Sequence, residues 1–215
     1  MTPSPYPPEA PRDCPLCPRL VEYRLENTRQ NPGWWNGAAP SFGDPDARLL
    51  VAGLAPGRTG ANRTGRPFTG DHAGWLLYET LQKVGFARGR YDPDGEDDLE
   101  LVDCMITNAV RCAPPGNKPL PVEEATCRPF LQSRLAALPR LKVIVTLGDV
   151  SRRNVLKTLG RPASAMPAGH GSEAVVGPYV LLNSYHCSRL NTNTGRLTAA
   201  MFEDVFRRAR TLIEA

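Results

Sequence analysis

The chain has 215 residues, a formal net charge of +4 and 41% hydrophobic residues, which suits an ordinary soluble core. No run reaches the roughly 18 apolar residues of a membrane span, and no charged, apolar and small-residue signal sequence opens the chain. These features favour the cytoplasm, and we expect one domain over residues 1–215 that does not bind a membrane.

The first half of the chain alternates helical and strand-like segments after an irregular start. Residues 1–12 are rich in proline, and we expect them to be irregular. Apolar residues at helical spacing predict a short helix over 16–26. The apolar run that begins at Ala47 and ends in Gly and Pro predicts a buried strand. Asp71 is typical of an N-cap for a helix over 72–86.

The second half continues this alternation. Apolar runs predict three further buried strands, over 99–110, 141–148 and 179–186. Helices are expected over 121–138, 149–159 and 194–213. Strands that alternate with helices predict an α/β sandwich around a mostly parallel sheet.

The loops that follow the strands are the expected place for a site, because ligands of open α/β sheets bind beyond the carboxyl ends of the strands. Three loops qualify: 53–71, 107–112 and 186–195. Arginine supplies most of the positive charge and suits phosphate contacts, although a GC-rich genome produces the same bias.

Two pairs of cysteines could supply the four ligands of a tetrahedral metal or an iron–sulfur cluster, Cys14 with Cys17 and Cys112 with Cys127. Six cysteines in an intracellular chain favour ligands or buried thiols over disulfides. Zinc is the default, but the segment CAPPGNKPLPVEEATC does not look like a zinc knuckle. Cys104, in an apolar strand, is interpreted as a buried thiol.

The glycine-rich loop 53–71 follows a strand and precedes a helix, as phosphate-binding loops do. It matches neither a P-loop nor the G-x-G-x-x-G pattern. Arg63 and Arg66 could meet phosphates, and Phe68 is either a stacking platform or the hydrophobic anchor of an ordered loop.

Two polar residues end other strands. Asn108 either caps a turn or reads a base edge, since its amide offers both a donor and an acceptor. His186 lies just past a strand end, where a lone histidine is structural, solvated or catalytic.

Taken together and in their order along the chain, these motifs resemble those of the uracil-DNA glycosylase superfamily. Within it, they resemble the iron–sulfur enzymes of family 5. The resemblance covers nearly the whole chain. It rests on the cysteine pattern, GLAPG from Gly53, RTGRPFTGD from Arg63, Asn108 before CAPPGN, and His186 with NTGRL downstream. Each element alone is weak, but the combination is specific.

The resemblance implies a three-layer α/β/α sandwich with a four-stranded, mainly parallel central sheet. It implies a [4Fe-4S] cluster held by Cys14, Cys17, Cys112 and Cys127. It also implies a monomeric, monofunctional glycosylase that flips uracil out of DNA, along with other deaminated bases such as hypoxanthine. Hydrolysis of the N-glycosidic bond would then start base excision repair.

Roles for individual residues follow from the same resemblance. His186 would stabilise the leaving base, and Asp71 would position water or stabilise the sugar cation, or only cap its helix. Substrate contacts are implied for Gly53, Leu54, Ala55, Phe68 and Asn108. DNA contacts are implied for Arg63, Arg66, Ser188, Leu190, Asn193 and Arg196.

Four residues qualify these roles. Leu54 and Ala55 stand where related families carry Glu or Asp, so the usual carboxylate is absent. Cys187 replaces the proline that usually follows the histidine, which implies a less rigid loop. Leu190 would enter the DNA stack as an apolar wedge, with loop packing as the alternative.

Two other functions remain open at this stage. A zinc-bound nucleic-acid module without catalysis would use the four cysteines, but it leaves Phe68, Asn108 and His186 unexplained. An enzyme acting on free nucleotides would need a phosphate-anchoring motif, and the sequence contains none that we recognise.

Overall fold

A computed structural model describes residues 5–215, and its centre is a six-stranded sheet in the order β1-β5-β2-β6-β8-β7. The strands are β1 (Phe42–Gly43), β2 (Leu49–Gly53), β5 (Cys104–Asn108), β6 (Val143–Leu147), β7 (Glu173–Val176) and β8 (Tyr179–Ser184).

The four inner strands β5, β2, β6 and β8 run parallel to one another. The expected four-stranded parallel sheet is therefore present, but the count of four is wrong because an antiparallel strand extends each edge. β1 and β7 are only two and four residues long. Strands this short carry little apolar periodicity, so no local pattern predicts them.

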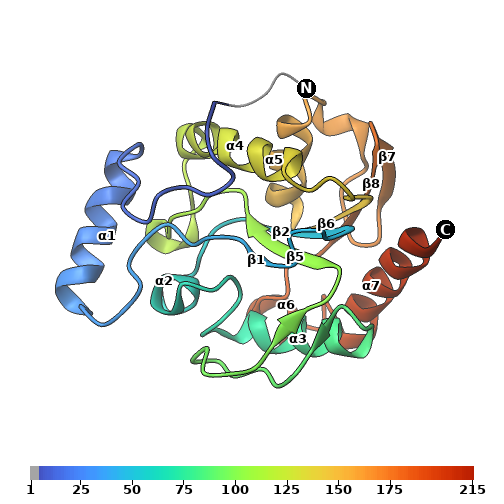
Figure 1. Cartoon of the computed structure of the whole chain (residues 1–215), viewed down its shortest axis with the longest axis horizontal. Helices are drawn as coiled ribbons and strands as arrows, with labels where there is room; N and C mark the ends of the chain where they lie inside the picture. The colour runs from blue at the N-terminus through green and yellow to red at the C-terminus, as the bar shows by residue number, and fades with distance from the viewer. Residues whose placement is uncertain (1–4) are drawn as a thin grey trace.

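Side chains of the inner strands alternate between two cores on opposite faces of the sheet. In β2, Leu49 and Val51 join one apolar cluster, whereas Leu50 and Ala52 join the other. The first face is covered by α3 (His72–Lys83) and α7 (Ala199–Glu214), and the second by α4 (Pro121–Ala136) and α5 (Asp149–Thr158). Figure 1 shows the resulting three layers.

The strand expected over 99–110 is divided in two. Asp103 takes a left-handed backbone, with φ of 54°, and separates β4 (Glu100–Leu101) from β5. Its carboxylate accepts hydrogen bonds from the backbone and side chain of Arg48, which fixes the break. β4 instead pairs with β3 (Ala87–Arg88) in a separate two-stranded sheet.

The last helix begins later than residue 194. Thr198 caps α7 by accepting a hydrogen bond from the Met201 amide, and Gly195 before it has φ of 70°. The preceding residues form the short helix α6 (Arg189–Asn193). The remaining helices are α1 (Pro18–Gln30), α2 (Ala61–Thr64), η1 (Pro115–Asn117) and η2 (Ala163–Ala165).

The proline-rich arm packs on the domain. Residues 5–12 contain no helix or strand, as expected, and residues 1–4 lie outside the described residues. The Glu9 carboxylate forms ion pairs with Arg111 and Arg134, and the carbonyl of Tyr6 accepts a hydrogen bond from Ser133. No described helix has both the length and the apolar character needed to cross a membrane.

Candidate active site

A cavity of about 860 Å³ opens at the carboxyl ends of the parallel strands. The three loops that sequence reasoning singled out all contribute to its wall. Among the residues expected to act on substrate or DNA, it is lined by Leu54, Ala55, Phe68, Asp71, Asn108, His186 and Ser188. Parallel strands end at the same edge of the sheet, which brings these distant residues together.

Gly53 makes room for two of these side chains. It is the last residue of β2 and pairs in register with Asn108, the last residue of β5. A Cβ atom on Gly53 would lie 2.4 Å from Asn108 Oδ1 and 2.8 Å from Phe68 Cζ. The absence of a side chain at Gly53 thus allows the Asn108 amide and the Phe68 ring to meet beside the cavity.

Phe68 has an unusual backbone and a defined ring partner. Its φ is 54°, in the left-handed region that phenylalanine rarely adopts. The residue is 8% exposed, and its ring lies 5.9 Å from the His186 ring, centroid to centroid, at an interplanar angle of 30°. The structure therefore places an aromatic face and an imidazole on the same cavity.

His186 lies just beyond the end of β8 in a setting that favours the neutral imidazole. Burial lowers its pKa from the ordinary 6.5, while the nearby negative charge of Asp71 acts in the opposite direction. Gly148, with φ of 95°, borders the imidazole, because a Cβ built on it would lie 3.5 Å from His186 Cβ. A neutral imidazole can still donate one ring N–H to an acceptor in the cavity.

Asp71 caps α3 and also lines the cavity. Its Oδ1 accepts a hydrogen bond of 3.1 Å from the Ala73 amide, as the sequence predicted for an N-cap. Its Oδ2 lies beside the glycines of the preceding loop, 3.0 Å from a Cβ built on Gly57 and 2.5 Å from one on Gly60. One carboxylate oxygen thus caps the helix, and the other lies close to the glycine loop, where a side chain on Gly57 or Gly60 would crowd it.

Several lining residues were missed by sequence reasoning. The junction from the end of β6 into the first turn of α5, Leu147 to Ser151, enters the wall. The rule that ligands bind beyond the carboxyl ends of parallel strands should have included it. Trp75 also lines the cavity and is 53% exposed, an unusual state for tryptophan that no local pattern signals. Asn117 enters from the segment between Cys112 and Cys127.

The residues expected on DNA have different surroundings. Leu190, on α6, is 73% exposed, and Arg196 lies over the Tyr185 ring at 4.4 Å from its centroid. Ser188 is the N-cap residue of α6, and Asn193 is its last residue.

Two of the expected phosphate ligands have partners within the protein. Arg63 pairs with Asp94 at 2.5 Å, and Arg66 pairs with Asp97 at 2.5 Å. The Arg66 side chain is only 14% exposed. Contact with phosphate stays a prediction for both residues, and what the structure shows is two internal ion pairs.

The four cysteines expected to bind metal line one separate, mostly apolar cavity, together with residues such as Leu20, Val110 and Phe130. All four thiols are free. Burial, assisted by the other thiols, raises the pKa of Cys112 to about 12 and that of Cys127 to about 11. Among residues 5–215, no three His, Cys, Asp or Glu side chains are placed closely enough to hold a metal ion as they stand.

Comparison with known proteins agrees with this architecture. The model of the uracil DNA glycosylase superfamily matches residues 40–210. A type-5 uracil-DNA glycosylase of Thermus thermophilus is 45% identical over 205 residues, with 93% of each chain covered. The type-5 enzyme of Pyrobaculum aerophilum is 40% identical, covering 92% of this chain and 88% of its own.

A more distant group also matches. A type-4 uracil-DNA glycosylase of Pyrobaculum aerophilum is 31% identical over 156 residues, 72% of this chain and 65% of its own. The type-5 relatives therefore cover more of the chain at higher identity. By the match over residues 40–210 and these relatives, the chain belongs to the uracil DNA glycosylase superfamily, within its type-5 group.

Proposed function

We propose that this protein is a DNA repair enzyme that removes uracil from DNA by hydrolysing its N-glycosidic bond. The observation that carries the proposal is the meeting of Phe68, Asn108 and His186 on one cavity at the strand ends. These side chains supply an aromatic face, an amide edge and a hydrogen-bond donor, which together suit a planar pyrimidine. The type-5 relatives are named for this activity.

The target base must leave the DNA stack to reach this cavity. Phe68 then stacks on the pyrimidine face, which is worth about 1–3 kcal/mol per base. The Asn108 amide, which offers both a donor and an acceptor, hydrogen-bonds the Watson–Crick edge. Because uracil and cytosine present different donors and acceptors on that edge, a fixed amide can discriminate between them.

Bond cleavage passes through an oxocarbenium-like transition state, in which negative charge develops on the leaving base. His186 donates a hydrogen bond to that charge from its neutral imidazole. A donor of this kind is worth about 2.7–4 kcal/mol in the transition state. Asp71 lies near the imidazole, and its Oδ2 faces the loop, where it can hold the attacking water or stabilise the sugar cation.

We also propose that the four cysteines hold a [4Fe-4S] cluster, which would act as a structural clip. The donor set fits, because four thiols line one apolar cavity and the Arg111 amide already donates a 3.3 Å hydrogen bond to Cys127 Sγ. The Arg111 Nε is buried without a hydrogen-bond partner, one of two such side-chain atoms among the described residues. A buried donor beside this cavity suits an anionic group.

The clip would join the segment around Cys14 and Cys17 to the residues that follow β5. Iron and sulfide analysis with an absorbance band near 400 nm tests it independently of activity. Stoichiometric zinc in a colourless protein would instead support the non-catalytic zinc module.

Excision assays test the catalytic proposal. Purified protein is incubated with single-stranded and duplex oligonucleotides that contain one uracil, and release of the free base is measured. The same oligonucleotides with hypoxanthine in place of uracil test whether the enzyme also removes other deaminated bases. Free uracil and an alkali-labile abasic site are expected, while an intact N-glycosidic bond in both substrates would refute the function.

A further inference from the structure

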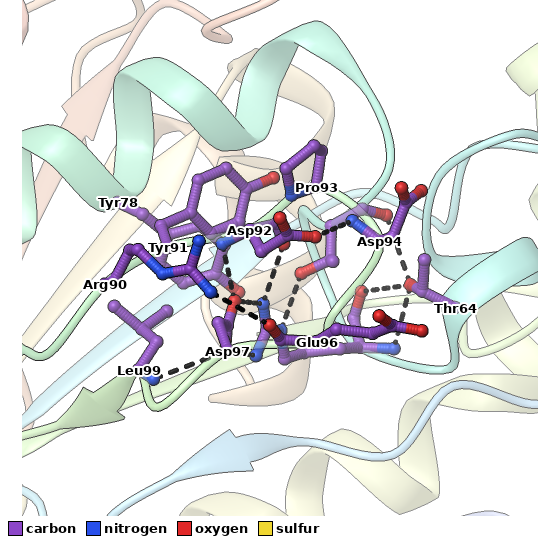
Figure 2. Close-up of polar contacts among 12 residues, drawn as sticks. Thr64, Tyr78, Arg90, Tyr91, Asp92, Pro93, Asp94, Glu96, Asp97 and Leu99 are labelled. Atoms are coloured by element: carbon purple, nitrogen blue, oxygen red, sulfur yellow. Dashed lines mark hydrogen bonds and ion pairs between the residues drawn. The ribbon is translucent and has the colours of Figure 1, made fainter.

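The loop that carries Phe68 is held by residues far away in the sequence. Phe68 keeps a φ of 54°, and a strained backbone persists only where its surroundings impose it. The surroundings in question are α3 and the acidic connection between β3 and β4, residues 89–99 (Figure 2). Neither element is one of the strand-end loops, although Trp75 of α3 and Pro93 of the connection reach the cavity wall.

Two tyrosine hydroxyls hold the backbone on either side of the strained bond. Tyr78, fully buried on α3, donates a 2.5 Å hydrogen bond to the carbonyl of Pro67. Tyr91 donates to the carbonyl of Phe68 at 3.4 Å. The two rings stack with centroids 4.7 Å apart, so each fixes the orientation of the other.

Arg66 joins this pair to the acidic connection. Its guanidinium makes two hydrogen bonds to Asp97, of 2.7 and 2.5 Å, and its Nε donates to Thr69 Oγ1 at 2.8 Å. The guanidinium carbon also lies 5.6 Å from the Tyr78 ring centroid and 5.8 Å from that of Tyr91. Arg66 thereby fixes both ends of the turn over 66–69.

Asp97 is itself held in a fixed orientation. Its side chain is only 1% exposed, and it accepts hydrogen bonds from the backbone amides of Asp92 and Leu99. The bond from Arg66 lowers the pKa of Asp97, so the carboxylate remains charged at neutral pH. The pair is therefore a part-buried, two-point link and not a mobile surface ion pair.

We propose that Arg66 and Asp97 are positioning residues for base stacking. Their ion pair, braced by Tyr78 and Tyr91, holds Phe68 in the orientation that presents its ring to the extruded base. The proposal rests on the proposed glycosylase function and deepens it, because it assigns a role to a connection that contributes no group to the chemistry.

A double-mutant cycle separates positioning from general stability. Single-turnover excision of uracil from single-stranded DNA is measured for wild type, Arg66→Met, Phe68→Ala and the double variant, below the melting temperature of each. We expect Arg66→Met to slow excision about tenfold to a hundredfold, as a displacement of about 1 Å in a positioned group does. Combined with Phe68→Ala, it should add less than about twofold, because no ring remains to be positioned.

A second cycle with Asp97→Asn covers the case in which Arg66→Met does not fold. The Asp97→Asn substitution removes the negative charge at this position. It keeps a side-chain oxygen that can accept hydrogen bonds from the backbone amides of Asp92 and Leu99. The matched control is Arg88→Met, which breaks an exposed ion pair with Glu100 in the β3–β4 sheet that brackets the same connection. That control should leave the rate unchanged.

Each outcome decides one question. In each cycle, the fold-losses in excision rate of the two single variants are compared with the fold-loss of the double variant. If they multiply in both cycles, the positioning role is overturned, while the glycosylase function stays intact. A slowing by Arg88→Met equal to that of Arg66→Met would also overturn it. A wild-type protein that releases no uracil would refute the proposed function, and this inference with it.

Discussion

Replacing Gly53 with alanine places one methyl group where the Asn108 amide and the Phe68 ring meet. The new carbon would lie 2.4 Å from Asn108 Oδ1 and 2.8 Å from Phe68 Cζ, closer than side-chain carbons approach. The strand itself cannot yield easily, because β2 is paired with a parallel neighbour on each side. The amide, the ring, or both must therefore move.

The expected loss of excision rate follows from the two contacts with the base that this movement would weaken. A weakened hydrogen bond from the amide to the base and a displaced stacking contact each cost about 1–2 kcal/mol. Together, about 2–4 kcal/mol corresponds to a decrease of about 30- to 1000-fold in the single-turnover rate constant. The change in thermal stability should be smaller, because much of the strain is relieved toward the open cavity.

The assay is single-turnover uracil excision, with the melting temperature measured in parallel. Gly33→Ala is the matched control, since a Cβ there would meet no atom within 4 Å. A Gly53→Ala rate within about twofold of wild type would refute the placement of Asn108 and Phe68 at the base.

Further predictions concern other parts of the site. His186→Ala should lower the single-turnover rate about a hundredfold to a thousandfold with little change in affinity for DNA; a loss confined to affinity would contradict the leaving-group role. By NMR, the His186 imidazole should titrate below pH 6.5, and lower still in Asp71→Asn, because Asp71 raises its pKa. Since the folded-state pKa is depressed, this group's contribution to stability is full above pH 6.5 and declines as the pH falls below it. Asp71→Asn keeps the helix cap, so full turnover by that variant would remove any role in activating water. Cys127→Ser should abolish the absorbance near 400 nm and lower the melting temperature, whereas wild-type values for both would refute the clip.

The main residues of the site could be predicted because each stands directly after a strand or in the loop that follows one. Asn108 ends β5 and His186 follows β8, and the parallel arrangement carries both to the same edge as Gly53. Apolar runs are long enough to identify the inner strands. Short edge strands such as β1 and β7 are paired only through tertiary contacts, which no local pattern records.

The surroundings of the stacking loop could not be predicted for a similar reason. Arg66 and Asp97 are 31 residues apart, and the acidic connection has no periodicity that would locate it in space. An exposed arginine that contacts DNA and a part-buried arginine that forms an internal ion pair look the same in sequence. Trp75 likewise sits in an ordinary helical pattern, and only the folded chain shows that it borders the cavity.

Release of free uracil from a defined oligonucleotide, compared between wild type and His186→Ala, tests the central claim most directly. Wild type should liberate the free base and leave an abasic site, and the variant should do so about a hundredfold to a thousandfold more slowly while binding the same DNA. Absence of free uracil with wild type, or equal release by the variant, would contradict the assignment of the chemistry to this cavity.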